Sequence, residues 1–268
     1  VVGRFVVRKL DVAAGTTTFV AGISNFSTTI VDGPFTQTRF RLPYQCARAF
    51  DGLYVTDLNG NALRFLNFTS GNTTTIDNNI VRPVGLWYDG GSALYVTSAL
   101  YFTIYKYTLP EGLRTVLAGA DYFTGSDYTP DGIPDPEIYY ADGVGTAARF
   151  NFPASIISTP GGLLYVADMF NDMIRMVNIS SQEVTTLFGY NNNTEQISRD
   201  GPFETARIFS PRGIAYDSFR NVLYITDGHG YLRHADLTLR TVTTLATTAT
   251  PQNLSLIHIS EPTRLLSI

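Results

Sequence analysis

The chain has 268 residues, of which 44% are hydrophobic and only 16% charged, and its formal net charge is -4. The hydrophobic content is ample for a packed core and excludes a wholly disordered chain, while net acidity argues against a nucleic-acid binder with a basic surface. No run of about 18 apolar residues predicts a membrane span. The single cysteine, Cys46, excludes an internal disulfide framework and is expected to be a small core residue.

The first strand-like segments form only part of a repeated unit. The passage from Val7 to Gly22 has the pattern of two successive strands, and the same pattern returns later in fuller units. We therefore expect residues 1–22 to be the outer part of one unit. Neither end of the chain is expected to be a natural terminus, because it begins at Val1 without a methionine.

A short motif then recurs along the chain. Leucine, tyrosine and a β-branched residue, followed by Thr or Ala and then Asp or Ser, stand together at residues 53–57, 94–98, 164–168 and 223–227. Successive tyrosines are 41, 70 and 59 residues apart, so the basic unit has about 41 residues and two units carry insertions. A period of this size, in segments rich in Val, Thr, Tyr and Phe, indicates stacked β units.

The third complete unit shows the predicted strands most clearly. They are expected at Phe152–Ile157, Leu163–Ala167, Met173–Ile179 and Glu183–Phe188. Four-stranded antiparallel units repeated radially make a β-propeller, in which each unit shields the faces of its neighbours. The predicted fold is therefore all-β, with about four and a half blades: the partial blade 1–22 and blades near residues 32–80, 81–119, 142–189 and 200–248.

The end of the chain is expected to be foreign to the protein. Residues 254–264 resemble a translated sequencing-library adapter at every position, which would make residues 254–268 a non-native tail. The propeller fragment would then comprise residues 1–253.

The third unit also resembles an NHL repeat. The resemblance rests on Asp142-Gly143 through Pro153, the run Leu164–Asp168, Arg175 and the closing segment Val184–Gly189. Similar openings occur at Asp32-Gly33 and Asp200-Gly201. The resemblance implies a six-bladed propeller of TolB-like architecture, so this fragment would lack more than one blade. The second complete unit departs from the pattern: residues 79–83 lack Asp-Gly, Ser98 replaces the aspartate and Tyr105 replaces the arginine.

Residues that recur in every unit are expected to serve the fold rather than a single active site. The recurring acids are Asp57, Asp168 and Asp227, each before a turn, and their carboxylates are expected to accept backbone N–H groups there. The recurring arginines are Arg64, Arg175 and Arg233, with Arg8 in the partial unit, and these are expected to pair with acids or to lie over aromatic rings. Each Asp-Gly is expected to supply a left-handed turn before the innermost strand.

We expect the functional residues in the loops and insertions that differ from one unit to the next. The loops between second and third strands should open on the same face as the loops between blades. All three long insertions (23–31, 120–141 and 190–199) lie between blades, and so on that face. The middle insertion combines acids with aromatics and no basic residue. Its candidate binding residues are Tyr122, Phe123, Asp127, Tyr128, Asp131, Asp135, Glu137, Tyr139 and Tyr140. We expect a contact loop; a solvated loop without a role and a calcium loop are the alternatives.

Catalytic residues are not evident in the sequence. His229 and His234 lack the further ligands of a zinc site, and the positions expected to enter the innermost strands, Phe40, Phe150 and Phe209, make a poor metal cage. We assign no catalytic residue, metal ligand or cofactor. The leading prediction is a non-enzymatic scaffold for a protein or glycan partner. The alternative is a propeller hydrolase or lyase, lactonase-like or amidating-lyase-like, with a metal in its channel.

Five Asn-x-Ser/Thr sequons bear on location. They begin at Asn25, Asn67, Asn72, Asn178 and Asn192, against about three matches expected by chance in a chain rich in Ser and Thr. This excess favours a glycosylated, secreted or cell-surface protein. A nucleic-acid partner is disfavoured by the acidity of the chain.

Overall fold

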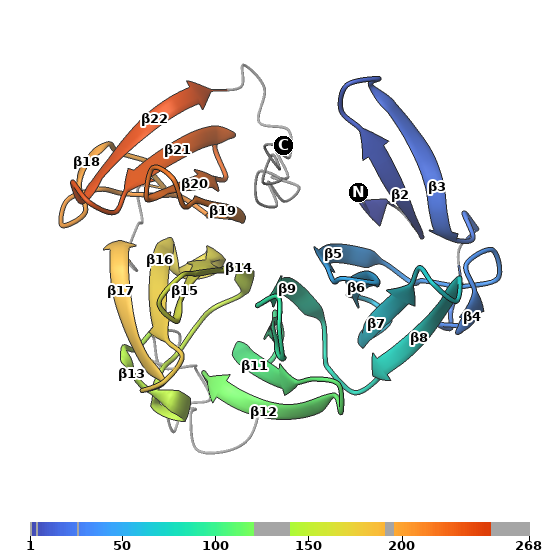
Figure 1. The fold of residues 1–268 in the computed structure, drawn as a ribbon. Coiled ribbons are helices and arrows are strands. Elements are labelled where there is room, and N and C mark those ends of the chain that lie inside the picture. The colour runs from blue at the N-terminus through green and yellow to red at the C-terminus, as the bar shows by residue number, and fades with distance from the viewer. Residues whose placement is uncertain (1, 4, 26, 121–139, 191–195, 248–268) are drawn as a thin grey trace, which may run out of the picture.

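The computed structural model describes residues 2–247 except residues 4, 26, 121–139 and 191–195. Within these residues the chain forms antiparallel strands and two 3-10 turns, Gly145–Ala147 and Met169–Asn171. The strands make five sheets arranged as blades around a central channel (Figure 1). The all-β propeller predicted from the repeat is confirmed.

The sheets follow one another in chain order. The first contains β1 (Val2–Gly3), β2 (Val6–Asp11) and β3 (Thr16–Gly22). The second contains β4 (Gly33–Pro34), β5 (Pro43–Arg48), β6 (Gly52–Asp57), β7 (Ala62–Asn67) and β8 (Asn72–Asp77). The third contains β9 (Pro83–Tyr88), β10 (Ala93–Ser98), β11 (Thr103–Thr108) and β12 (Leu113–Ala118).

The last two sheets repeat the five-stranded pattern of the second. One contains β13 (Gly143–Val144), β14 (Pro153–Thr159), β15 (Leu163–Asp168), β16 (Met173–Asn178) and β17 (Glu183–Gly189). The other contains β18 (Gly201–Pro202), β19 (Gly213–Asp217), β20 (Val222–Thr226), β21 (Tyr231–Asp236) and β22 (Thr241–Thr247).

The innermost strands β5, β9, β14 and β19 line the channel, and the arc is open between the last sheet and the first (Figure 1). The first sheet has no innermost strand among the described residues. The total of six blades remains a prediction.

Each Asp-Gly opens a short strand at the outer edge of its blade. Gly143 pairs with Val184 of β17, so the chain enters the blade beside its outermost strand and only then crosses to the channel. The expected positive φ is present at the equivalent Gly33 (123°) and Gly201 (140°). The expectation of a simple turn was incomplete, because the segment is itself an edge strand.

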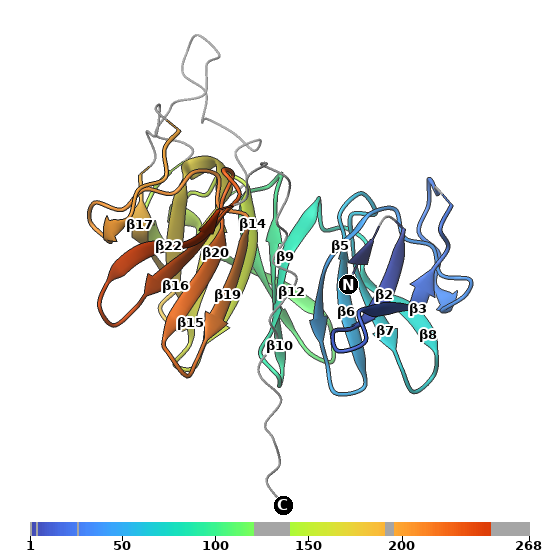
Figure 2. The same ribbon diagram turned by 90° about the horizontal axis from the view of Figure 1, so that it is seen from above.

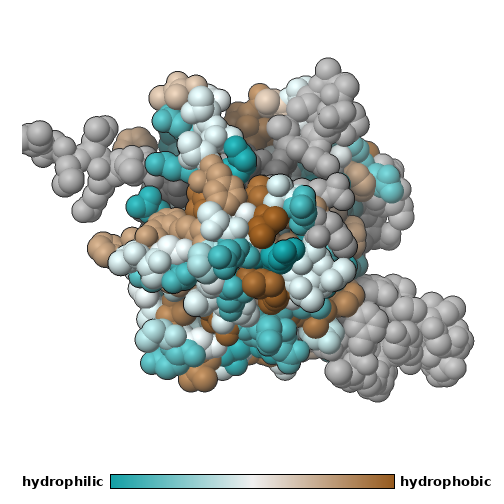
Figure 3. All heavy atoms as spheres, turned by 90° about the vertical axis from the view of Figure 1, so that its right-hand side faces the viewer, coloured by the Kyte–Doolittle hydropathy of each residue, from teal (hydrophilic) through white to brown (hydrophobic). Residues whose placement is uncertain are grey.

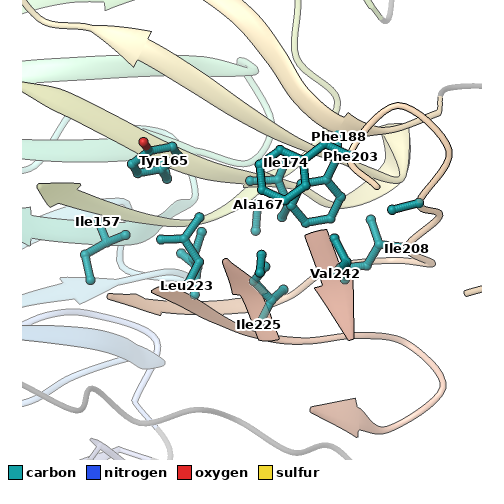
Figure 4. Close-up of a cluster of buried hydrophobic side chains, with 13 residues drawn as sticks. Ile157, Tyr165, Ala167, Ile174, Phe188, Phe203, Ile208, Leu223, Ile225 and Val242 are labelled. Carbon is teal, nitrogen blue, oxygen red and sulfur yellow. The ribbon is translucent and has the colours of Figure 1, made fainter. Parts of the chain in front are cut away.

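Apolar side chains fill the spaces between neighbouring sheets. Between the last two blades, Ile157 and Tyr165 face Leu223 and Ile225 across one buried cluster (Figure 4). The second-strand tyrosines Tyr54, Tyr95 and Tyr165 take part in such clusters, whereas Tyr224 of the last described blade does not. Burial at this scale, roughly 25 cal/mol per Å² of apolar surface, holds the blades together without disulfides.

The two rims of the propeller differ. In the side view of Figure 2, the loops between blades lie on one rim, the loop face, whereas the first-to-second and third-to-fourth strand hairpins lie on the other, the hairpin face. On the one side of the molecule drawn in Figure 3, the coloured hydrophilic and hydrophobic residues are interleaved, without a broad apolar patch among them. No helix in the described part of the chain has the length and apolar character of a membrane span.

Candidate functional site

A buried arginine lies at the same place in three blades. Arg64, Arg175 and Arg233 each have a fully buried side chain. Arg175 donates to the Asp142 carboxylate at 2.7 Å and to the Asp168 carboxylate at 3.0 Å. It also donates to the backbone carbonyls of Arg149 and Ala141, at 2.8 and 2.9 Å. Two carboxylates and two carbonyls therefore surround this one guanidinium, which is what a buried charge requires.

A β-bulge completes the arrangement. Between Ile174 and Arg175 the pairing of β16 with β17 shifts by one residue. Beside the bulge, the backbone N–H of Thr186 donates to one oxygen of Asp142 at 3.3 Å, and its hydroxyl donates to the other at 3.1 Å. Asp142 thus ties the entering chain to both the inner arginine and the outer strand of its blade.

The same arrangement recurs in two other blades. Arg64 donates to Asp32 at 2.7 Å, and Asp32 accepts both groups of Thr75 at 2.9 Å. In the last blade, the corresponding residues are Arg233, Asp200 and Thr244. The guanidinium carbons of Arg64 and Arg175 also lie 5.2 and 5.1 Å from the ring centres of Phe40 and Phe150. We call each set of arginine, Asp-Gly aspartate and threonine a clamp.

The second-strand aspartates are engaged as well. Asp57 accepts the backbone N–H groups of Arg41 and Leu42, and Asp227 accepts those of His229 and Tyr231. These bonds hold the turn or the adjoining loop in place. The carboxylate oxygens of Asp57 and Asp227 therefore accept hydrogen bonds within their own blades.

Asp168, the second-strand aspartate of the fourth sheet, has a strongly shifted pKa. Complete burial raises its pKa to about 6, although Arg175, the Asn171 amide and the Asn151 N–H act in the opposite direction. Asn171 itself is buried and donates to Asp168 at 2.8 Å. The repeat pattern of the sequence did not predict this contact.

The third sheet lacks the clamp altogether. Tyr105 stands at the arginine position and Val116 at the threonine position. Arg114 of β12 instead pairs with Asp77 at 2.9 Å and lies 4.9 Å from the Tyr105 ring centre. All three clamp residues are thus replaced together, as expected if they act as one unit.

Most of the candidate contact loop lies outside the described residues. This applies to Tyr122, Phe123, Asp127, Tyr128, Asp131, Asp135, Glu137 and Tyr139, and also to the sequon at Asn192. Tyr140 is described: its hydroxyl lies 3.1 Å from that of Thr186, and its ring lies beside Arg175. The structure thus places Tyr140 against the clamp of its own blade.

The histidines lie in different surroundings. The His229 ring is close to Phe209 and Tyr231, and its Nε2 lies 2.6 Å from the carbonyl of Gln196. His234 lies on β21 beside Tyr224. No group of three potential metal ligands occurs among the described residues.

The alignment of Phe209 with Phe40 and Phe150 was wrong. The bridges Val31–Arg39, Ala141–Arg149 and Arg199–Arg207 show that the residue after each arginine is equivalent, and in the last blade this is Ile208. The constant spacing from Asp-Gly would have found it. Phe40, Phe150 and Ile208 are buried in the apolar clusters between blades.

Two sequons coincide with turn-forming positions. The Asn67 side chain accepts the N–H of Ser70, and that of Asn178 accepts the N–H groups of Ser180 and Ser181. Asp236 does the same in the last blade. A requirement for an Asx turn therefore explains why asparagine recurs there. Glycosylation at these positions, and at Asn25 and Asn72, remains a prediction.

Comparisons with known proteins agree with this architecture. NHL repeat-containing protein 2 from Bos taurus is 27% identical over 198 residues, covering 68% of this chain, and the Homo sapiens protein of that name is 27% identical over 201 residues, covering 69%. The chain spans about a quarter of the length of these relatives. No protein-family model matches the chain.

Solved structures share the fold at low identity. A nidogen/laminin complex aligns with 90% of this chain and 75% of its own at 17% identity, with a TM-score of 0.57. A streptogramin B lyase aligns with 92% and 63% at 12% identity, with a TM-score of 0.56. An auxiliary nutrient-binding protein from Bacteroides ovatus covers 92% and 60% at 18% identity and a TM-score of 0.56. Repeat sequence, blade structure and these matches together support an NHL-repeat β-propeller.

Proposed function

We propose that this propeller is a non-enzymatic interaction scaffold that binds a protein or glycan partner through its loop face. The observation that carries the proposal is the threefold clamp. The arginines that recur are buried, and each is bonded to a recurring aspartate, as Arg175 is to Asp142, so these residues serve the blades. Recognition then falls to the loops, which vary from blade to blade on a rigid support.

Exposed aromatic side chains on the loop face support this proposal. Phe170, in the turn after β15, is 57% exposed and packs against Phe152 with ring centres 5.0 Å apart. Tyr190, at the end of β17, is 51% exposed and lies beside Arg207. Aromatic and arginine side chains contribute a large share of binding energy in protein interfaces. The nidogen/laminin complex shows one propeller of similar fold in a complex with a protein.

A paired replacement tests which face binds. In one variant, residues 122–139 are replaced by a Gly-Ser linker; in the other, Phe50 and Phe219 on the hairpin face are changed to serine. Both phenylalanines are almost fully exposed, so the second variant should fold normally. Partners retained from extracts of the native host are compared by quantitative mass spectrometry. We expect the loop variant alone to lose specific partners; loss from the hairpin variant alone would refute the proposal.

The alternative function is a metal-dependent hydrolase or lyase, and the observation in its favour is the likeness to a streptogramin B lyase. The metal would have to lie in the channel, since the recurring aspartates are used by the blades. Calorimetric titration of the full-length protein with calcium and zinc distinguishes the two functions. Saturable heat from either metal would favour the enzyme, and its absence would favour the scaffold.

A further inference from the structure

The last blade places two arginines opposite each other where two other blades have one. On either side of β18, Arg199 and Arg207 form a β-bridge in which each backbone N–H donates to the carbonyl of the other, at 2.9 and 3.0 Å. The equivalent bridges have Val31 or Ala141 opposite the repeated arginine. Arg207 therefore belongs to the repeat, whereas Arg199 does not.

The bridge holds both side chains on one face. Residues that exchange both backbone hydrogen bonds in an antiparallel pair have Cα atoms roughly 5.5 Å apart and side chains on the same side. The guanidinium of Arg199 donates to the carbonyl of Thr205, from Nε at 3.2 Å and from Nη2 at 2.7 Å. That of Arg207 donates to the carbonyl of Ala206 at 3.0 Å. Because these carbonyls belong to successive residues, both guanidiniums are held at the same turn.

Neither guanidinium is neutralised by a carboxylate. Within the part of the chain that the structure describes, neither Arg199 nor Arg207 forms an ion pair. The two acids between them in the sequence are engaged elsewhere: Asp200 belongs to a clamp, and Glu204 pairs with Arg240 at 3.1 Å. Like charges directly opposite each other are destabilising. An anion bound to both arginines would relieve that repulsion.

An exposed aromatic ring adjoins the pair. Tyr190 follows β17, the strand that closes the preceding blade, and its ring centre lies 5.0 Å from the guanidinium carbon of Arg207. Tyr190 is 51% exposed, Arg199 is exposed and Arg207 is partly exposed, so all three are accessible from outside the blades. We call these three residues the paired-arginine site.

The chemistry of the site indicates the ligand. Guanidinium groups bind carboxylate and phosphate oxygens through parallel hydrogen bonds. A phosphate monoester carries a charge of about −1.5 to −2 at neutral pH, which balances two arginines, whereas a single carboxylate balances one. An aromatic ring attached to the phosphate would also pack against Tyr190. Phosphotyrosine combines both features.

We propose that the paired-arginine site binds a phosphorylated tyrosine of a protein partner, with the phosphate on Arg199 and Arg207 and the phenyl ring against Tyr190. This inference rests on the proposed function, because it names the chemical group that a partner would present at the edge of the loop face. All three residues of the site are described.

The test uses N-acetyl-phosphotyrosine amide as the probe, and its binding to the full chain is followed by line broadening in phosphorus NMR. N-acetyl-phosphoserine amide, which has the phosphate without the ring, is the comparison probe. The variant is Arg199→Val, because valine already occupies the equivalent bridge position at Val31. Its matched control is Arg48→Gln, at an exposed arginine on β5 in another blade. Circular dichroism verifies that both variants fold.

We expect the phosphotyrosine probe to bind about tenfold more weakly to Arg199→Val, because charge-assisted hydrogen bonds are lost, and equally well to Arg48→Gln. The phosphoserine probe should bind the parent chain about threefold more weakly than the phosphotyrosine probe, because it lacks the ring contact. No binding at millimolar probe, or equal weakening in the two variants, would overturn the proposal. Equal binding of the two probes would overturn the assignment to tyrosine.

A sulfated glycan is tested in the same experiment. If a heparin fragment displaces the probe, binds more tightly than it does and depends on Arg199, the choice of a phosphorylated protein is overturned. Failure of the inference is distinguishable from failure of the proposed function. If the probe does not bind but replacement of residues 122–139 still removes partners, the inference fails while the proposed function stands.

Discussion

Asp142 and Arg175 lie 2.7 Å apart, although 33 residues separate them in the chain. One end of this pair is the first residue of the blade and the other lies in its third strand. The bond therefore joins the residue at which the chain enters the blade to the third strand of the same sheet. The Arg175 side chain is fully buried, whereas that of Asp142 is 43% exposed, so water reaches only the acidic end.

Removing the buried arginine should destabilise the protein strongly. Arg175→Met leaves the buried Asp168 and the partly buried Asp142 without their cation, and breaking a buried pair in this way costs about 3–5 kcal/mol. Urea unfolding measures the loss. Arg114→Met serves as the control, because that ion pair is partly exposed and should contribute about 1 kcal/mol or less. Equal losses for the two variants would contradict a special role for the clamp.

The threonine of the clamp should be coupled energetically to its aspartate. A double-mutant cycle of Asp142→Ala and Thr186→Val should give a coupling free energy of about 1 kcal/mol, because each substitution removes one side of a direct hydrogen bond. Thr186→Val combined with Thr244→Val, in different blades, should be additive. Additivity within the first pair would show that the clamp is not a unit.

Stability should depend on the ionisation of Asp168. Its folded pKa, about 6, exceeds the ordinary value of 3.8, so the folded state holds this proton more tightly than the unfolded state. Ionisation therefore opposes folding: the contribution of Asp168 to stability is greatest below pH 4 and falls between pH 4 and 6. The full effect is about 3 kcal/mol, from 1.36 kcal/mol per pKa unit.

Asp168→Asn checks this dependence by urea unfolding at several pH values. We expect the difference in unfolding free energy between variant and parent to change steeply from pH 4 to 6 and to be flat above pH 7. A difference that does not vary with pH would show that the carboxyl titrates normally in the fold.

The turn asparagines should differ in their tolerance of aspartate. Asn178→Asp keeps the acceptor oxygen that caps the turn, as Asp236 does naturally, so it should change stability by less than about 0.5 kcal/mol. Asn67→Asp keeps the acceptor too, but it loses the hydrogen bond that the Asn67 amide donates to Asp51 at 3.3 Å and places two carboxylates together, so it should cost more. Alanine at either position removes the acceptor and should cost about 1 kcal/mol. Both aspartate variants also remove a sequon, so intact mass from the native host, before and after glycosidase treatment, reports whether either asparagine carries a glycan.

The strands were predictable because their residues alternate and repeat. The strand expected at Leu163–Ala167 is β15 (Leu163–Asp168), and the one expected at Glu183–Phe188 is β17 (Glu183–Gly189). The edge strand β13 was missed, since two residues, one of them glycine, cannot show a strand pattern.

The polar contacts were only partly accessible from the sequence. Recurrence predicted that Arg175 would pair with an acid or lie over a ring. It did not predict the bonds from Thr186 to Asp142, because these lie beside a bulge that depends on how β16 pairs with β17.

Photo-crosslinking from two matched positions tests the central claim most directly. A benzoylphenylalanine replaces Phe170 on the loop face in one protein and Phe219 on the hairpin face in another; both side chains are exposed, at 57% and 91%, so neither change should disturb the core. The proteins are irradiated in the native host and the adducts identified by mass spectrometry. We expect specific adducts from position 170 and background from position 219. Specific adducts from position 219 alone, or none from 170, would contradict a partner-binding loop face.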